Sequence, residues 1–309
     1  MKPLRLGTRG SALALWQART VASRLERIGR SVELVTISTR GDRRQTESLA
    51  DLSAEVGKGV FTKEIQDALL RGQIDLAVHS SKDMAAVSPD GLAIGAVLER
   101  EDPRDALVLP GTPPPTTFAP ALLGRDPVLG TGSPRRIAQL RRLFEGARFE
   151  AIRGNVDTRL RKLDEGQVHA LVLACAGLRR LGLDDRITAP IPVDLCVPAP
   201  GQGIIAIETR SGDTMVSEAV ARLNDPDAWI ALAAEQAVVA ELGGGCQLPL
   251  GAHAVLAGQE LRLTAVAAAP GGGEAIFAAI TASVADPAGA GRRLAADLAS
   301  RGARELLHS

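Results

Sequence analysis

The strongest constraint on the fold is an alternation of short apolar strands with amphipathic helices at the start of the chain. Strands are predicted at Leu4 to Gly7 and at Val32 to Ser38, with a helix from Ser11 to Ile28 between them. A helix from Phe61 to Leu70 and a strand from Ile74 to Val78 continue the order. This βαβ rhythm is typical of an open α/β sheet.

A second alternation of predicted strands and helices follows a charged segment. The segment EREDPRDAL, Glu99 to Leu107, is charged and broken by proline, which predicts a crossover between domains. Strands and helices alternate again between Val128 and Ala174. A second crossover is marked by four prolines: Pro190, Pro192, Pro198 and Pro200.

Two crossovers predict that the second domain is inserted into the first, because the chain returns through a strand at Ile204 to Glu208. A helix from Ala228 to Leu242, three strands and a last helix from Gly289 to Leu307 then predict a small α+β domain. The expected division is residues 1–101 with 198–216, residues 102–197, and residues 217–309. A chain of 309 residues is long enough for each part to have its own core.

Charge and targeting signals exclude several classes of protein. Thirty-six basic residues balance thirty-six acidic ones, so no bulk positive field favours nucleic-acid binding. The N-terminal MKPLRLGTRG lacks the apolar core of a signal peptide, and no apolar run approaches the length that spans a membrane. A cytoplasmic protein without membrane partners is expected.

Cysteines and histidines show no metal-binding pattern. The three cysteines are odd in number and without CxxC spacing, which indicates neither a disulfide framework nor a zinc site. Cys175 and Cys196 lie among apolar residues and are interpreted as small core residues. Cys246 follows three glycines at a predicted helix end, on an accessible loop where a thiol is available for covalent chemistry, although such cysteines are often inert.

Three segments share one pattern, in which a strand ends in a small-residue loop with arginine and a helix begins at once. They are GTRGSALALWQA, GTGSPRRIAQL and IRGNVDTRL. Unpaired amides at a helix start attract anions, and guanidinium groups add paired donors. The pattern predicts a polyanion site at the carboxyl ends of two sheets. The alternative is a set of ordinary helix caps with solvated arginines. The residues concerned are Ser11, Ser133 and Asn155 as caps and Arg9, Arg135, Arg136, Arg153 and Arg159 as cations.

A further segment, LAVHSSKDM, places Lys82 and Asp83 at the carboxyl end of a buried-looking strand. Ligands meet α/β domains at such ends, where an aspartate can stabilise a developing cation and a lysine can bind a carboxylate. A solvated turn pair would give the same spacing. His79, within the strand, is interpreted as a structural histidine.

Taken in order, these motifs resemble those of the porphobilinogen deaminase (hydroxymethylbilane synthase) family. The resemblance rests on GTRGSALALWQA, VGKGVFTKE, LAVHSSKDM, EREDPRDA, GTGSPRR, RGNVDTRL, AGLRRLGL, PAPGQG and GGGCQLPLGA, and is weakest after about Leu256. It implies two periplasmic-binding-protein-like α/β domains with a hinge and a third α+β domain. It also implies a transferase of tetrapyrrole and heme biosynthesis, a monomer, with a dipyrromethane cofactor held through a thioether to Cys246.

The resemblance also implies roles for individual residues. Each porphobilinogen would lose ammonia to give a cationic azafulvene, and Asp83 matches the family's catalytic aspartate. The positions that match cofactor-binding residues are Cys246, Lys82, Ser11, Ser133, Arg135 and Arg136. The positions that match substrate-binding residues are Arg9, Arg153, Arg159, Arg180, Lys58, Phe61 and Gln202, of which Lys58 and Phe61 match a flexible loop at about residues 43–59. No metal is implied.

Two other classes of protein share part of this pattern. A non-enzymatic protein that captures a small anion between two α/β lobes would have the same helix starts, but would not need Asp83 or Cys246. It would usually carry a signal peptide or a helix-turn-helix, and neither is found. A phosphate-handling transferase is disfavoured because no GxxxxGK[ST] motif occurs.

Overall fold

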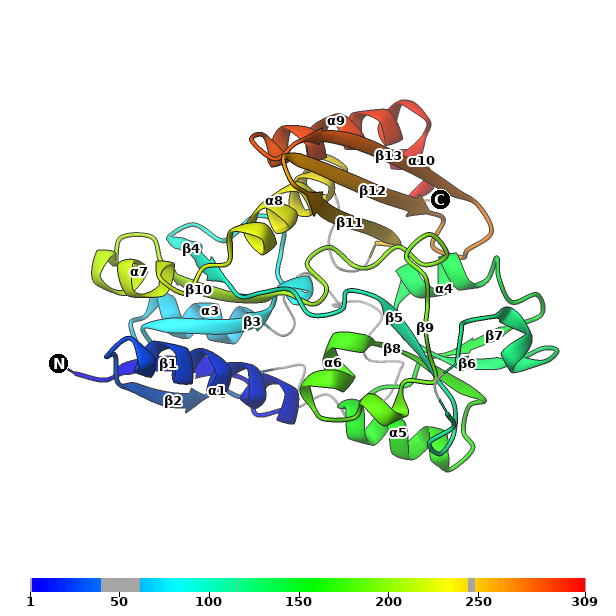
Figure 1. Cartoon of the computed structure of the whole chain (residues 1–309), viewed down its shortest axis with the longest axis horizontal. Coiled ribbons are helices and arrows are strands. Elements are labelled where there is room, and N and C mark those ends of the chain that lie inside the picture. Colours follow the sequence, from blue (N-terminus) through cyan, green and yellow to red (C-terminus); the bar gives the residue numbers. More distant parts are fainter. Residues whose placement is uncertain (1, 40–61, 115, 244–247, 309) are drawn as a thin grey trace. The chain divides into compact units, whose positions relative to one another are not determined.

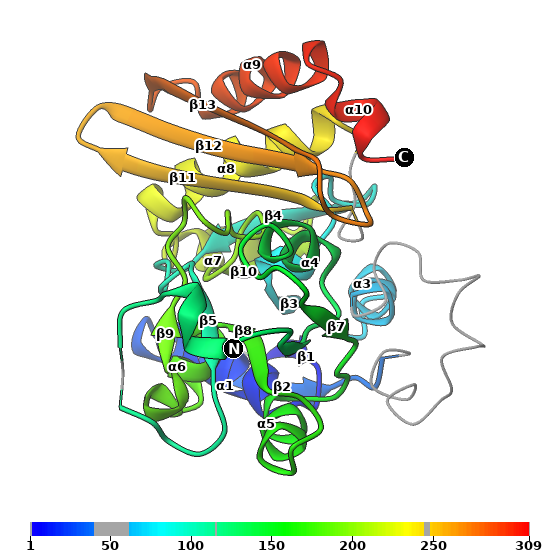
Figure 2. The same ribbon diagram turned by 90° about the vertical axis from the view of Figure 1, so that its right-hand side faces the viewer.

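The computed structural model describes residues 2–39, 62–114, 116–243 and 248–308. The chain packs as two units, Met1–Arg100 with Ile204–Trp229 and Glu101–Gly203 with Ile230–Ser309. Figures 1 and 2 label their helices and strands. The two units are described one at a time.

The first unit is built on a five-stranded sheet of order β2-β1-β3-β10-β4. β1 runs parallel to both of its neighbours, whereas β10 runs antiparallel to β3 and β4. The elements are β1 (Leu4–Thr8), α1 (Ala12–Arg27), β2 (Val32–Thr36), α3 (Lys63–Leu70), β3 (Leu76–Ser80), β4 (Leu92–Val97), β10 (Ile205–Arg210) and α7 (Thr214–Ala221).

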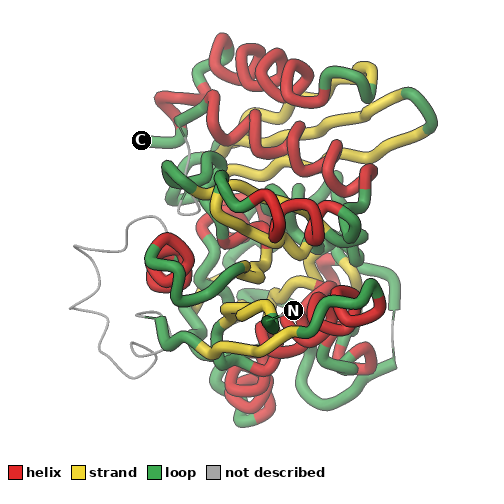
Figure 3. The backbone as a smooth tube through the Cα atoms, turned by 90° about the vertical axis from the view of Figure 1, so that its left-hand side faces the viewer, coloured by secondary structure: helices red, strands yellow, loops and turns green. Residues whose placement is uncertain are grey.

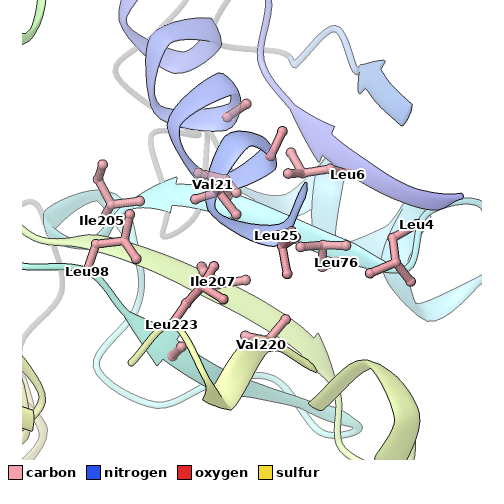
Figure 4. Packing of buried hydrophobic residues seen from close by; sticks show 14 of the residues in the cluster. Leu4, Leu6, Val21, Leu25, Leu76, Leu98, Ile205, Ile207, Val220 and Leu223 are labelled. Atoms are coloured by element: carbon pink, nitrogen blue, oxygen red, sulfur yellow. The ribbon is translucent and has the colours of Figure 1, made fainter. Parts of the chain in front are cut away.

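Apolar side chains on both faces of this sheet are buried under helices. Leu76 of β3 packs with α1 and α7 on one face, in the cluster drawn in Figure 4, while Ala77 packs with α3 on the other. Val220 and Leu223 belong to the first of these clusters. Helix α7 therefore packs with the first sheet, and the boundary predicted at residue 216 falls inside this helix.

The second unit contains a sheet with the same arrangement, of order β7-β6-β8-β5-β9. β6 is parallel to β7 and β8, and β5 is antiparallel to β8 and β9. Helices α5 and α6 pack on one face and α4 on the other. The elements are β5 (Asp105–Val108), β6 (Val128–Gly130), α4 (Pro134–Leu140), β7 (Arg148–Glu150), α5 (Val156–Asp164), β8 (Ala170–Ala174), α6 (Cys175–Arg180) and β9 (Ala189–Pro190).

Strand β5 differs from the sequence-based expectation, which treated residues 99–107 as a crossover. Residues Asp105–Val108 form a strand that is buried throughout and pairs with β8 and β9. The short apolar run after Asp105 has a partner on each side, and this tertiary pairing outweighs the flanking charges and proline. In each sheet one strand runs antiparallel to its neighbours, β10 in the first and β5 in the second, and each follows a crossover between the predicted domains.

The rest of the second unit is a smaller α+β layer. An antiparallel sheet of order β11-β12-β13 lies against α9, as Figure 3 shows by secondary structure. The single predicted helix at 289–307 is two helices, because Gly302 has a φ of 86° that ends the first. The elements are α8 (Pro226–Glu241), whose first four residues belong to the first unit, β11 (Leu250–Ala257), β12 (Glu260–Ala268), β13 (Ala275–Ser283), α9 (Pro287–Ser300) and α10 (Ala303–Leu306). The predicted fold class, two α/β domains with a C-terminal α+β domain, is confirmed.

Gly251 of β11 allows a close approach between backbones in the second unit. A Cβ atom at this position would lie 2.7 Å from the Val197 carbonyl oxygen and 3.0 Å from Val266 Cγ1. The neighbouring Ala252 N–H donates to the Pro198 carbonyl at 3.1 Å. Both obstacles leave little room, since one is backbone and the other a buried side chain.

We therefore predict that Gly251→Ala destabilises the fold by about 1–3 kcal/mol, the usual cost of overpacking. Gly212→Ala is the matched control, because no atom lies within 4 Å of its added Cβ. Denaturant unfolding of both variants measures the difference. Equal stability of the two variants would contradict the close packing described.

Candidate active site

Two loops of the first unit lie at the same edge of its sheet, because β1 and β3 are neighbouring parallel strands. Arg9 and Ser11 follow β1, and Lys82 and Asp83 follow β3. Ser11 starts α1, where its Oγ accepts a hydrogen bond from the Ala14 N–H at 3.3 Å. Four residues predicted separately are thus brought to one edge of the unit.

The loop after β3 is a 3₁₀ turn, Ser81–Asp83, with two unpartnered polar groups. The turn is fixed by its backbone, as the Ser81 N–H donates to the Ile204 carbonyl at 3.0 Å. Ser81 is 3% exposed, and its hydroxyl has no hydrogen-bond partner in the part of the chain that the structure describes. Among the described residues, nothing forms a hydrogen bond or ion pair with the half-buried carboxylate of Asp83. Such groups are available to a ligand that carries N–H donors or positive charge.

The buried side chain of Gln17 ties α1 to the end of β3. Its Nε2 donates to Ser80 Oγ at 2.9 Å, and the Ser80 hydroxyl donates back to Gln17 Oε1 at 3.2 Å. Because Ser80 directly precedes the 3₁₀ turn, this pair sets the position of the Asp83 loop relative to Ser11. No sequence motif singles out Gln17. The signal that could have identified it is its position as a polar residue on the apolar, buried face of the helix.

His79 belongs to an internal cluster rather than to this edge. Its Nε2 lies 3.2 Å from Glu208 Oε2, with 3% of the His79 side chain and none of the Glu208 side chain exposed. Gln66 Nε2 donates to the other carboxylate oxygen at 3.0 Å. The cluster joins β3, β10 and α3, which agrees with the structural role interpreted from the sequence.

In the second unit, loops with arginine follow the parallel strands β6 and β7. Ser133 starts α4, and its Oγ accepts from the Arg136 N–H at 3.4 Å. Arg153 is exposed in the loop before α5. The same loop turns at Gly154, whose φ is 113°, and Arg159 Nε donates to the Gly154 carbonyl at 2.8 Å. The side chain of Arg159 therefore folds back on the loop that holds Arg153.

The two arginines of α4 are buried on a carboxylate that the sequence analysis did not single out. Asp105 is fully buried, and its Oδ2 lies 2.8 Å from Arg135 Nη2. Arg136 Nη2 and Nε approach Asp105 Oδ1 at 2.7 and 3.0 Å. The sequence predicts guanidiniums that face a bound anion, whereas here each holds an internal carboxylate. The sequence signal that could have indicated this buried carboxylate was an aspartate, Asp105, at the start of an apolar run.

The charge state of this cluster follows from its contacts. Burial raises the pKa of Asp105, but the positive charges of Arg135 and Arg136 outweigh burial and hold the pKa well below its usual range. Cys196 Sγ lies 3.4 Å from Asp105 Oδ2. Burial, assisted by the Asp105 charge, raises the pKa of the Cys196 thiol to about 12, so the thiol is neutral. The carboxylate is ionised between two cations.

Arg180 and Gln202 contact the end of the second crossover. Arg180 Nη2 donates to the Gly203 carbonyl at 2.6 Å, and burial lowers the pKa of Arg180 to about 10 against the opposing charge of Glu101. Gln202 is 1% exposed, and its Nε2 donates to Asp105 Oδ1 at 2.9 Å and to the Pro103 carbonyl at 2.6 Å. Gln202 thus joins the Asp105 cluster.

Three predicted site residues lie outside the described residues: Cys246, Lys58 and Phe61, together with the loop at about 43–59. In the described part of the chain, no group of three or more His, Cys, Asp or Glu side chains is placed to hold a metal. Within the same residues, none of the helices combines the length and apolar character needed to cross a membrane.

Comparison with known families identifies the family to which the chain belongs. Residues 4–218 match the family model "Porphobilinogen deaminase, dipyromethane cofactor binding domain", and residues 229–300 match "Porphobilinogen deaminase, C-terminal domain". The chain belongs to the porphobilinogen deaminase family. The porphobilinogen deaminase of Syntrophotalea carbinolica is 45% identical over 98% of this chain and 95% of its own length. That of Syntrophomonas wolfei is 44% identical over 99% and 98%.

One of the solved structures that match the chain shows a distant likeness. The second substrate binding domain of a putative amino acid ABC transporter from Streptococcus pneumoniae is 12% identical, with a TM-score of 0.42 over 72% of this chain and 91% of that chain. A likeness at this TM-score carries no functional information. Family membership therefore rests on the sequence matches.

The described residues fit the cofactor named by the family model. A dipyrromethane combines pyrrole N–H donors with several carboxylates, so its binding site needs both acceptors and cations. The first unit offers the Ser81 hydroxyl and the Asp83 carboxylate, neither of which has a partner among the described residues, on the same turn as Lys82. The second offers Ser133 and exposed Arg153. This donor set matches both kinds of group.

The two described thiols are poor candidates for covalent attachment. Burial is the largest cause that raises the pKa of Cys175 to about 12, as it does for Cys196. At pH 8 we expect roughly one part in ten thousand of each to be thiolate. Neither should react with iodoacetamide in the folded protein, and both should react after unfolding. Mass spectrometry of labelled peptides checks this, and rapid labelling of either cysteine in the native state would contradict it.

Proposed function

We propose that this protein is a hydroxymethylbilane synthase. It condenses four porphobilinogen molecules head to tail with release of ammonia, on a covalently bound dipyrromethane primer, and releases the linear tetrapyrrole by hydrolysis. The observation that carries the proposal is the match of nearly the whole chain to the porphobilinogen deaminase family, cofactor-binding domain included. The unpartnered carboxylate at the end of β3 supports it.

Cofactor binding is assigned to six residues that match the family's cofactor-binding positions. When bound, the dipyrromethane supplies the free α-carbon to which each new pyrrole ring is joined. Cys246 holds it through a thioether, since this cysteine follows three glycines whereas the other two are buried in the fold. Lys82, Ser11, Ser133, Arg135 and Arg136 bind its carboxylates. For the last two, the internal contacts with Asp105, Val172, Cys196 and Val197 account for three of the five N–H groups of each guanidinium.

Substrate binding is assigned to five cations that recognise acetate and propionate groups, together with one aromatic residue and one amide. Every added ring brings two carboxylates, and arginine binds a carboxylate through paired donors. The assigned residues are Arg9, Arg153, Arg159, Arg180, Lys58, Phe61 and Gln202. Arg153 is exposed and suited to direct contact, whereas Gln202 is buried and would act through the residues it holds.

Asp83 is assigned to catalysis because of its charge and its environment. Loss of ammonia and formation of the carbon–carbon bond both develop positive charge on pyrrole nitrogens. A carboxylate that is held by a fixed turn and has no protein partner among the described residues can stabilise that charge without first breaking another contact. This protein would act as a cytoplasmic monomer in porphyrin and heme biosynthesis, without nucleic-acid or membrane partners.

The covalent attachment gives the first test. We predict that Cys246→Ser removes the dipyrromethane adduct from the purified protein, while Cys175→Ser and Cys196→Ser keep it, because only Cys246 is expected on an accessible loop. Intact-mass measurement of the three variants and the wild type shows which chains carry two additional pyrroles. An adduct that persists in Cys246→Ser would refute the assignment.

The second test concerns Asp83. Asp83→Asn keeps the shape of the side chain but removes its charge, so the turn should fold while turnover falls by about a hundred- to a thousandfold. Asp83→Glu keeps the charge at a displaced position and should retain more activity than Asp83→Asn. Porphobilinogen consumption is measured on protein whose adduct has been confirmed by mass. Near wild-type turnover in Asp83→Asn would show that Asp83 is an ordinary turn residue.

A further inference from the structure

The cluster around Asp105 contains two guanidinium groups and one carboxylate. All three side chains are nearly inaccessible, with exposed fractions of 5% for Arg135, 8% for Arg136 and 0% for Asp105. The other polar side chains in contact with Asp105 are the thiol of Cys196 and the amide of Gln202, both neutral. The cluster therefore carries one positive charge in excess, inside a protein of zero formal net charge.

A buried charge without a counter-charge costs free energy, and an anionic ligand bound beside it would reduce that cost. Both cations lie in the first turn of α4, next to Ser133 at the helix start. Asp105 fixes both of them at once, because each oxygen of its carboxylate faces a different guanidinium. The backbone carbonyls of Val172 and Val197 orient the far sides of the same groups at 2.8 and 2.7 Å. The carboxylate and the two carbonyls thus hold both guanidiniums through contacts within the protein.

We propose that Asp105 is a positioning residue for carboxylate binding in this enzyme: it aligns Arg135 and Arg136 and leaves the pair with one excess positive charge beside Ser133. The inference rests on the proposed function, since the carboxylates concerned are those of the dipyrromethane. Asp105 acts through the arginines and need not touch the cofactor.

Gln202 extends this role to the second crossover. Its amide donates both to Asp105 and to the Pro103 carbonyl, so the position of the carboxylate is tied to the segment 199–203. Gly203, one residue further, is held by Arg180 and by the Glu101 N–H. A substitution of Gln202 should therefore alter the position of Asp105 and, through it, the position of Arg136. The sequence of the arginines would be unchanged.

The test is the loading of cofactor per folded chain. We expect Asp105→Asn, which removes the negative charge that the two guanidiniums share, to lower the rate of dipyrromethane attachment by about tenfold or more, the effect of losing a charge-assisted hydrogen bond. Asp105→Glu restores the charge and should recover part of the rate. Each variant is incubated with porphobilinogen, the adduct is followed by intact mass, and the folded fraction is measured by circular dichroism.

Asp102→Asn is the matched control. Asp102 lies three residues away, has a side chain that is 7% exposed, and also pairs with two arginines, Arg104 at 2.7 Å and Arg179 at 3.2 Å. It has no contact with α4 among the interactions of the described chain. Its loss should lower stability while leaving the loading rate per folded chain unchanged.

A second variant covers the case in which Asp105→Asn does not fold. Gln202→Leu leaves both ion pairs of Asp105 in place and removes only the amide, and it should lower the loading rate severalfold in the same assay. Loading at the wild-type rate per folded chain in Gln202→Leu, or in a folded Asp105→Asn, would overturn the inference. A wild-type protein that never acquires the adduct would instead refute the proposed function.

Discussion

Parallel pairing of neighbouring strands is the constraint on which the candidate site depends. Because β1 and β3 run in the same direction, the loops that follow them emerge at one edge, and Ser11 and Asp83 share it. The same pairing of β6 with β7 brings the loops of Ser133 and Arg153 to one edge of the second sheet. Residues far apart in the sequence are thus brought to one edge of a sheet by backbone pairing, to which the Gln17–Ser80 side-chain pair adds in the first unit.

The antiparallel strand of each sheet has a different role, because it carries a buried carboxylate that binds side chains of neighbouring elements. β5 supplies Asp105, which holds Arg135 and Arg136, and β10 supplies Glu208, which meets His79 and Gln66. Both carboxylates are fully buried, so their partners are fixed in position. The buried carboxylate of each unit therefore connects its antiparallel strand to a neighbouring helix.

The C-terminal layer is joined to the second sheet through the backbone of the second crossover. Glu235 of α8 is fully buried and accepts from the Gly201 N–H and the Ala254 N–H, each at 2.7 Å. Gln202, the next residue, reaches Asp105. One short turn therefore links α8 to β5, the strand that carries Asp105.

Local patterning by itself determined the two α/β rhythms, the C-terminal α+β segment, the helix starts at Ser11 and Ser133, and the motifs around Asp83 and Cys246. These features follow from periodicity, caps and glycines, which act over a few residues. Strand β5, the Gln17–Ser80 pair and the Asp105 cluster were decided only by tertiary structure. Each depends on partners 31 to 97 residues away, such as Arg136, Ser80 and Gln202, and no local signal encodes a contact at that distance.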